Sequence, residues 1–343
     1  MTMTRFQRFV MFVFLLVGCG SSKERVDTPQ PQPSANASAS AAASADPTTT
    51  VTPTASATTT TTAPPAVAWK PFLYKISGTK PSYLFGTIHV PDDRLAMPAQ
   101  SLKDAFHDAE EVVTELPLDD TSPAHAMQLA GMPNGKSLTT ELPKPVYERL
   151  KKVLTDKGLG MAMPMMDHMK VWAVAIQVGL LDHLQELMGG KKPIDVVLHD
   201  RAKELGKKTS GLETEAEQLT VFNTLSKDEQ SRFLEEALDE RDADAAAHRD
   251  SFTALMNLYL AGDETPLLTQ LNQGFDLKKP LDQKIMKRLI TDRNKVMTDR
   301  ISAKLKATPG KTYLFAVGSA HLLGDDGIVA QLKKKGLTVE RVQ

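Results

Sequence analysis

Hydrophobic and polar residues follow strand-like and helix-like patterns only in the part of the chain that begins near Trp69. Phe72 to Ser77 alternates enough to predict a strand. The turn-forming residues 78–81 separate it from a second short apolar strand, which begins near Ser82 and leads to His89 before the break at Pro91. Val112 and Val113 begin a third, which Pro117 ends. The N-terminal part of the folded region is therefore rich in predicted strands.

Helical spacing of apolar residues dominates the middle of the chain. Pairs of capping residues, Thr214 with Glu217 and Ser226 with Glu229, mark two helix starts. Further strands are predicted near the C-terminus. The predicted helices are 99–109, several within 121–205, 227–261, 282–305 and 327–335, and the remaining predicted strands are 207–210, one from Tyr313, and 337–342. This order predicts an α/β (α+β) domain whose central mixed sheet is built from N- and C-terminal strands, with a large helical insertion.

The first residues have the order of a secretory signal. Arg5 and Arg8 precede an apolar run, Phe9 to Val17, which is too short for a comfortable transmembrane helix. Gly18-Cys19 follows, and Leu16 to Cys19 resembles the bacterial lipobox, in which the cysteine is lipidated after cleavage. Cys19 is the single cysteine, which excludes an internal disulfide and leaves lipidation as its best use. The alternative is an ordinary signal peptide with an incidental cysteine.

Composition divides the rest of the chain. Residues 20–67 are mostly Ser, Thr, Ala, Pro and Gln, which bury too little apolar surface to order, so we expect a disordered tether. Residues 68–343 form the predicted folded domain. A lipid at Cys19 would anchor the protein without spanning the membrane, and Gly20 favours the outer over the inner membrane of a cell envelope. The net charge of -1 gives no basic field for nucleic acid.

Candidate chemistry begins with a repeated phrase. Tyr83-Leu84-Phe85 leads to Gly86-Thr87-Ile88-His89, and Tyr313-Leu314-Phe315 leads to Gly318-Ser319-Ala320-His321. Both phrases end in Gly-x-x-His, and we expect each glycine to let the backbone turn sharply at a strand end. Two histidines presented alike by two strands predict a shared site.

Other polar residues extend this set. Glu115 ends a buried strand, where a carboxylate is costly unless it is paired. Glu213 follows the predicted strand 207–210, and Arg293 lies in the predicted helix 282–305. Imidazole and carboxylate groups are ligands for zinc, manganese or cobalt, and His89, Glu115 and His321 are the candidate ligands. The same residues are sufficient for metal-free acid–base catalysis, with Arg293 stabilising an oxyanion or orienting a carboxylate.

Simpler interpretations of these residues stay open at this point. A histidine at a strand end is often structural, Glu213 would only charge a helix N-terminus, and Arg293 would form a surface ion pair. Methionines at 161, 163, 165, 166 and 169 either fill a core or line a groove. Neither a His-Glu-x-x-His helix nor a Gly-x-Ser-x-Gly elbow is present, which leaves Ser319 a weak candidate nucleophile.

Taken in order, five motifs resemble the TraB/GumN family over nearly all of the folded part. They are Tyr83 to Pro91, Val113 to Leu116, Gly211 to Thr214 with Gln218, Arg293-Asn294, and Val317 to Leu322 with Gly324 and Gly327. The family includes the animal Tiki proteases and is similar in proposed fold to erythromycin-esterase and ChaN-like proteins. The resemblance implies a site with both histidines and Glu115, a divalent metal, and peptide hydrolysis.

These observations lead to three hypotheses. The first is a lipid-anchored, metal-dependent hydrolase, peptidase-like, that uses His89, His321 and Glu115, with Glu213 and Arg293 assisting. The second is a metal-free, esterase-like hydrolase that uses the same residues. The third is a surface lipoprotein that captures a ligand without turnover. The expected partners are a peptide or small-molecule substrate and, through the lipid anchor, a membrane.

Overall fold

The structure is a computed structural model that describes residues 69–95, 99–119, 122–183, 191–273 and 275–342. These residues fall within one compact unit. The predicted signal peptide 1–19 with Cys19, and the tether predicted for 20–67, lie outside the described residues. Among the residues described, we find no helix with the length and apolar character needed to cross a membrane.

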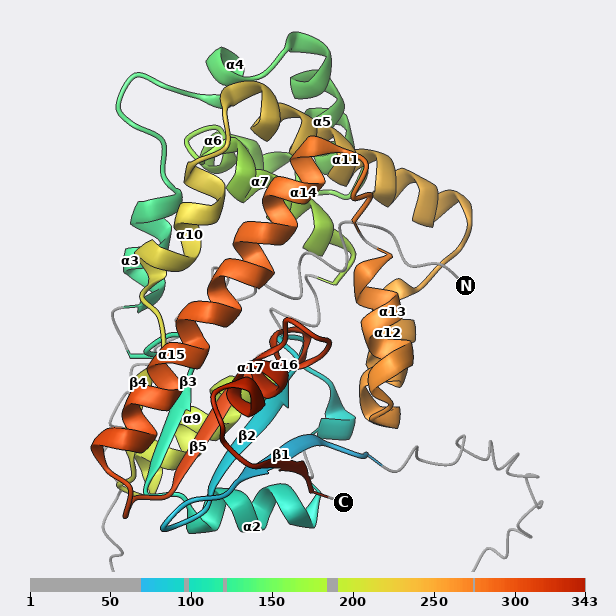
Figure 1. Cartoon of the computed structure of the whole chain (residues 1–343). Helices are drawn as coiled ribbons and strands as arrows, with labels where there is room; N and C mark the ends of the chain where they lie inside the picture. The colour runs from blue at the N-terminus through green and yellow to red at the C-terminus, as the bar shows by residue number, and fades with distance from the viewer. Residues whose placement is uncertain (1–68, 96–98, 120–121, 184–190, 274, 343) are drawn as a thin grey trace, which may run out of the picture. The chain divides into compact units, whose positions relative to one another are not determined.

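A six-stranded mixed sheet forms the centre of the fold (Figure 1). Its strands are β1 (Phe72–Ile76), β2 (Ser82–Thr87), β3 (Glu111–Thr114), β4 (Lys208–Gly211), β5 (Tyr313–Gly318) and β6 (Val339–Arg341), in the spatial order β4-β3-β5-β2-β1-β6. The four strands β4, β3, β5 and β2 are parallel, and β1 pairs antiparallel with both β2 and β6. The predicted α/β class and the mixed sheet are confirmed.

The repeated phrases lie on neighbouring strands, but one residue out of step. Thr87 of β2 is opposite Gly318 of β5, and Gly86 is opposite Val317. Gly86 therefore lies inside its strand, and the prediction that it makes a sharp turn at the strand end is wrong. Its missing side chain instead permits close packing, because a Cβ there would lie 2.9 Å from Phe72 Cβ and 3.1 Å from Ser319 Cα.

Helices surround the sheet and fill the segment between β3 and β5. They are α2 (Gln100–Asp108), α3 (Ser122–Ala130), α4 (Leu138–Glu141), α5 (Lys144–Asp156), α6 (Met163–Met166), α7 (Val171–Leu180), α9 (Ile194–Glu204), α10 (Glu215–Asn223), α11 (Lys227–Ala246), α12 (Ser251–Ala261), α13 (Glu264–Asn272), α14 (Pro280–Met286), α15 (Asp292–Ala307), α16 (Ser319–Leu322) and α17 (Ile328–Lys334). A π-helical segment, Lys287–Thr291, joins α14 to α15. Short 3-10 turns occur at Asp93–Leu95, Gly160–Ala162 and Leu181–His183.

Several local predictions are confirmed by the helix ends. Capping boxes start α10 at Thr214 and α11 at Ser226. Gly262 ends α12 with a φ of 70°, a conformation that favours glycine. The helix predicted at 282–305 is present, but the π-helical segment interrupts it, and such segments occur frequently at functional sites.

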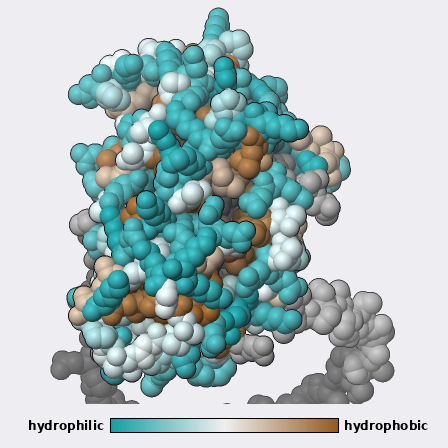
Figure 2. All heavy atoms as spheres, in the orientation of Figure 1, coloured by the Kyte–Doolittle hydropathy of each residue, from teal (hydrophilic) through white to brown (hydrophobic). Residues whose placement is uncertain are grey.

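Packing of apolar faces joins the helices to the sheet and to one another. Helix α9 packs on β3 and β4, and α2 packs on β2, while α7 packs along α11 in the helical insertion. There the ring of Trp172 stacks on that of Phe222, with centroids 5.1 Å apart. The methionine cluster divides: Met163 and Met166 are core residues, whereas Met161 and Met165 are exposed. Figure 2 shows a mostly hydrophilic face, on which hydrophobic residues appear in separate patches.

Candidate functional site

The parallel strands bring the predicted site residues to one edge of the sheet. His89 comes two residues after β2, Glu115 directly follows β3, Glu213 comes two residues after β4, and His321 lies in α16 just after β5. The carboxyl ends of parallel strands share one edge, which is where ligands bind in open α/β sheets. Each of these four side chains is buried, with 5% exposure or less.

Glu115 lies at the centre of the cluster. Its Oε1 accepts a hydrogen bond from the Gly318 N–H at 2.6 Å, and its Oε2 accepts from Arg293 Nη2 at 2.6 Å and from Gln218 Nε2 at 3.2 Å. Burial, the largest single influence, would raise the pKa of this carboxyl, but the charge of Arg293 and the smaller contributions of the two histidines together outweigh burial and hold the pKa well below its usual value. Glu115 is therefore ionised at neutral pH.

Both imidazoles direct Nε2 toward one oxygen of Glu115. The distance to Glu115 Oε1 is 3.7 Å from His89 Nε2 and 3.8 Å from His321 Nε2. On the other side of its ring, His89 Nδ1 lies 3.2 Å from Asp195 Oδ2. Burial lowers the pKa of His89, but the charges of Asp195 and Glu115 outweigh burial and raise it to about 10. With no metal present, His89 is an imidazolium.

His321 has a tautomer that its neighbours determine. The amide nitrogen of Asn294 donates to the Asp326 carbonyl at 2.9 Å, so Asn294 Oδ1 is an acceptor. His321 Nδ1 lies 2.7 Å from that oxygen and must carry the proton. Burial and the charge of Arg293 lower the pKa of His321 to about 3. The ring is neutral, and its Nε2 lone pair faces Glu115.

Arg293 joins Glu115 to the second buried carboxylate. Its Nη2 donates to Glu213 Oε2 at 2.7 Å as well as to Glu115, and its Nε lies 3.0 Å from the same Glu213 oxygen. Arg293 is only 4% exposed, so the surface ion pair considered above is wrong. Burial raises the pKa of Glu213 in spite of the Arg293 charge. The two carboxyls that share one guanidinium thus have pKa values shifted in opposite directions.

The two imidazole nitrogens and the carboxylate are the donor types that a divalent cation binds, but their separations are slightly too long for one ion. Ligands about 2.1 Å from one ion lie about 3.0–3.5 Å apart, slightly less than the separations of both Nε2 atoms from Glu115 Oε1. Accordingly, no group of three or more His, Cys, Asp or Glu residues in the described part of the chain has metal-holding geometry as it stands. Gly318 leaves space beside the cluster, since a Cβ there would lie 3.1 Å from Glu115 Oε1 and 3.4 Å from His89 Nε2.

Residues that sequence reasoning missed support both histidines. Asp195 is 3% exposed and shares its helix face with buried Ile194 and Leu198, and an acidic residue on an apolar face was the available signal. Asn294 and Gln218 entered only as parts of family motifs, without a role. Carboxylate and amide partners on the far nitrogen are typical of metal-binding histidines. Ser319, the alternative nucleophile, is fully buried.

A cavity of about 480 Å³ adjoins the cluster on the Asn294 side. Side chains from α13, the π-helical segment and α16 line it, and Asn294 belongs both to its wall and to the site. Most of its lining is apolar, including Leu271, Phe275 and Ile290, whereas Asp325 and Asp326 add acidic residues. An apolar group of a ligand fits such a cavity.

Two curated relatives whose names state an activity are similar in sequence to most of this chain. "Metalloprotease TIKI2" of Danio rerio is 30% identical over 304 residues, which cover 76% of this chain and 58% of the relative. "Metalloprotease TIKI1" of Homo sapiens is 27% identical over 311 residues, covering 78% of this chain and 61% of the relative. The chain thus spans about three fifths of the length of these relatives. No solved structure matches.

The family comparison covers nearly the whole described domain. Residues 72–341 match the model of the TraB/PrgY/gumN family, from the first strand to the last. That range includes all five motifs on which the resemblance in the sequence was based. The match covers well over half of the chain, and the chain therefore belongs to the TraB/PrgY/gumN family.

Proposed function

We propose that this protein is a metal-dependent hydrolase of peptide bonds. The observation that carries the proposal is the convergence of His89 Nε2 and His321 Nε2 on Glu115 Oε1, at 3.7 and 3.8 Å. The printed names of the animal relatives, metalloproteases, support the same reaction class.

His89, His321 and Glu115 are the proposed ligands of a zinc, manganese or cobalt ion. A divalent ion supplies Lewis acidity, which lowers the pKa of water and polarises a carbonyl. Asp195 and Asn294 hold the Nδ1 side of each ring, so that each Nε2 faces inward. His89 must lose the proton that its raised pKa retains before it can serve as a ligand.

The two glutamates have different proposed roles, Glu115 as a metal ligand and Glu213 as the general base. Glu115 is ionised, and Arg293, Gln218 and Gly318 hydrogen-bond to it, which suits a ligand and not a proton acceptor. Burial raises the pKa of Glu213, bringing it nearer to neutral pH, as a general base requires. Glu213 would take the proton from water and return it to the leaving amine.

Arg293 orients these carboxylates. Its Nε and Nη2 contact Glu213, and Nη2 also contacts Glu115, so those donors already have carboxylate partners. Of the two roles expected from the sequence, orienting a carboxylate therefore fits better than binding an oxyanion. The cavity beside Asn294 is the proposed position for an apolar side chain of the peptide.

Anchoring at the envelope completes the proposal. Cys19 lies in the lipobox-like sequence, and a lipid there with the tether 20–67 would hold the hydrolase near a membrane surface, preferentially the outer one. Mass spectrometry of the mature N-terminus tests this part independently of the reaction.

Metal content and turnover, measured side by side, test the reaction. Purified full-length protein would be loaded with manganese, cobalt or zinc, analysed for bound metal, and screened against a peptide library. We expect near-stoichiometric metal and cleavage in the wild type, with neither in His89→Ala/His321→Ala. Glu213→Gln should keep the metal but lose turnover. Cleavage without metal would instead favour the esterase-like alternative, and metal-free protein without turnover would favour ligand capture.

A further inference from the structure

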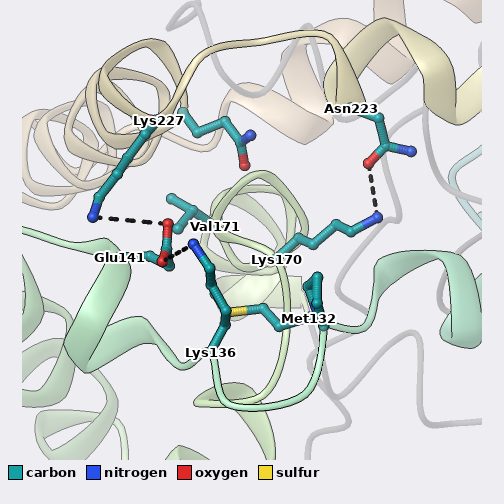
Figure 3. Close-up of a pocket in the computed structure, with 9 residues that line it drawn as sticks. Met132, Lys136, Glu141, Lys170, Val171, Asn223 and Lys227 are labelled. Atoms are coloured by element: carbon teal, nitrogen blue, oxygen red, sulfur yellow. Dashed lines mark hydrogen bonds and ion pairs between the residues drawn. The ribbon is translucent and has the colours of Figure 1, made fainter.

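A second pocket lies in the helical insertion, and none of its lining residues belongs to the candidate site. Its volume is about 400 Å³, and its walls come from the ends of α4 and α10, the starts of α7 and α11, and the loop after α3 (Figure 3). The proposed hydrolase does not use it.

Positive charge dominates the lining. Lys136 and Lys227 approach one carboxylate, Glu141, at 2.8 and 3.8 Å. Figure 3 shows these three side chains meeting on one side of the pocket, while Lys170 extends along the opposite side toward Asn223. The lining thus contains three ammonium groups and one carboxylate, in a chain whose net charge is only -1.

Lys170 has neutral hydrogen-bond acceptors. Its Nζ donates to the Leu129 carbonyl at 2.7 Å and to Asn223 Oδ1 at 3.0 Å. Trp172 Nε1 donates to the same Asn223 oxygen at 3.1 Å, so that acceptor is shared. Burial lowers the pKa of Lys170, and both of its acceptors are neutral, so neither supplies an opposite charge. A bound anion would supply that compensation.

Backbone charge adds to that of the side chains. Lys170 is the N-cap of α7, a ten-residue helix whose N-terminus has no side-chain cap, and Val171, its first residue, lines the pocket. The partial positive charge of a helix start favours anions. Met132, Pro133 and Val171 give the same pocket an apolar portion.

We propose that this pocket binds the phosphate group of an organic phosphate. Three lysines and a helix start match a dianion better than a single carboxylate, and lysine serves as a point-charge partner of phosphate. The apolar residues and a volume well above that of a phosphate ion accommodate an organic part. A soluble phosphomonoester and the phosphomonoester headgroup of phosphatidic acid share this chemistry, and the experiment below separates them.

The test measures binding by the full-length protein. Glycerol 3-phosphate and inorganic phosphate would be titrated by calorimetry, and binding to phosphatidylcholine vesicles would be compared with and without phosphatidic acid. We expect saturable millimolar or tighter binding of one phosphate source, weakened about tenfold or more by Lys170→Gln and by Lys136→Gln. Preference for glycerol 3-phosphate would identify a soluble ligand, and binding only to vesicles that contain phosphatidic acid would identify a headgroup.

A matched control is Lys152→Gln, because Lys152 is an exposed lysine outside the pocket that pairs with Asp156. It should leave binding unchanged. Lys227→Gln provides a second pocket variant if Lys170→Gln lowers the thermal midpoint. Absence of saturable binding to every probe would overturn the proposal, as would equal weakening by Lys152→Gln and the pocket variants.

Discussion

Replacing Gly318 with alanine separates a ligand-holding cluster from a merely structural one. The added Cβ would lie 3.1 Å from Glu115 Oε1, 3.4 Å from His89 Nε2 and 3.5 Å from His321 Cδ2. Alanine tolerates the backbone conformation there, with φ near -51° and ψ near 133°. The substitution therefore fills the space beside the cluster without imposing backbone strain.

Stability should fall moderately. The 3.1 Å contact requires Glu115 Oε1 to move by a few tenths of an ångström, whereas the contacts of 3.4 and 3.5 Å are ordinary. Overpacking of this kind costs about 1–3 kcal/mol. The lower entropy of the unfolded alanine variant offsets about 0.4–1 kcal/mol of that cost. We therefore expect a net loss of about 1–2 kcal/mol in the free energy of unfolding.

Function should change much more. A carbon in this position presses against Glu115 Oε1 and contacts His89 Nε2, two of the proposed ligand atoms, so we expect metal affinity and kcat/KM to fall by about 100-fold or more. Metal competition assays and peptide turnover measure the two effects. The matched control is Gly310→Ala, where a Cβ meets nothing within 4 Å. Wild-type metal binding and turnover in Gly318→Ala would refute the proposed ligand arrangement.

Two substitutions beside the cluster and one pH titration of its histidines provide further tests. Asp195→Asn removes the charge beside His89 Nδ1, and metal affinity should fall about 10- to 100-fold in a chelator competition, whereas Asp200→Asn on the same helix should not change it. Arg293→Met leaves two buried carboxylates without their cation and should cost about 3–5 kcal/mol in urea unfolding; a loss below about 1 kcal/mol would contradict the buried network. In metal-free protein, the contribution of His89 to stability is present below pH 6.5 and is lost as the pH rises toward 10. The contribution of His321 to stability is present above pH 6.5 and is lost as the pH falls toward 3. Together, these two residues place the maximum urea midpoint near pH 6.5. A midpoint that rises steadily to pH 10 would contradict the pKa of His89.

Local sequence was sufficient for the strands and for the residues that follow them. Short apolar blocks bounded by turn formers predicted β2, β3 and β5, and parallel pairing then placed His89, Glu115 and His321 at one edge. The capping boxes at Thr214 and Ser226 were equally readable, because both partners lie within one helical turn.

Residues contributed by helices were harder to predict. Asp195 reaches His89 only because α9 packs against β3 and β4, and local sequence does not specify which sheet a helix will cover. The pairing of Arg293 with Glu213 joins groups 80 residues apart. The one-residue offset between the repeated phrases likewise depends on the pairing of β2 with β5, and not on either phrase alone.

The position of β5 between β2 and β3 has a consequence for biosynthesis. A hydrogen bond between Ser82 and the N–H of Tyr313 joins residues 231 positions apart, so the middle of the sheet closes only after synthesis has passed residue 313. Contacts this distant in sequence slow folding. Before residues 313–321 emerge, His321 is missing and β2 lacks its parallel partner. The candidate site is therefore incomplete during most of synthesis, and it gains its full set of residues in one late step.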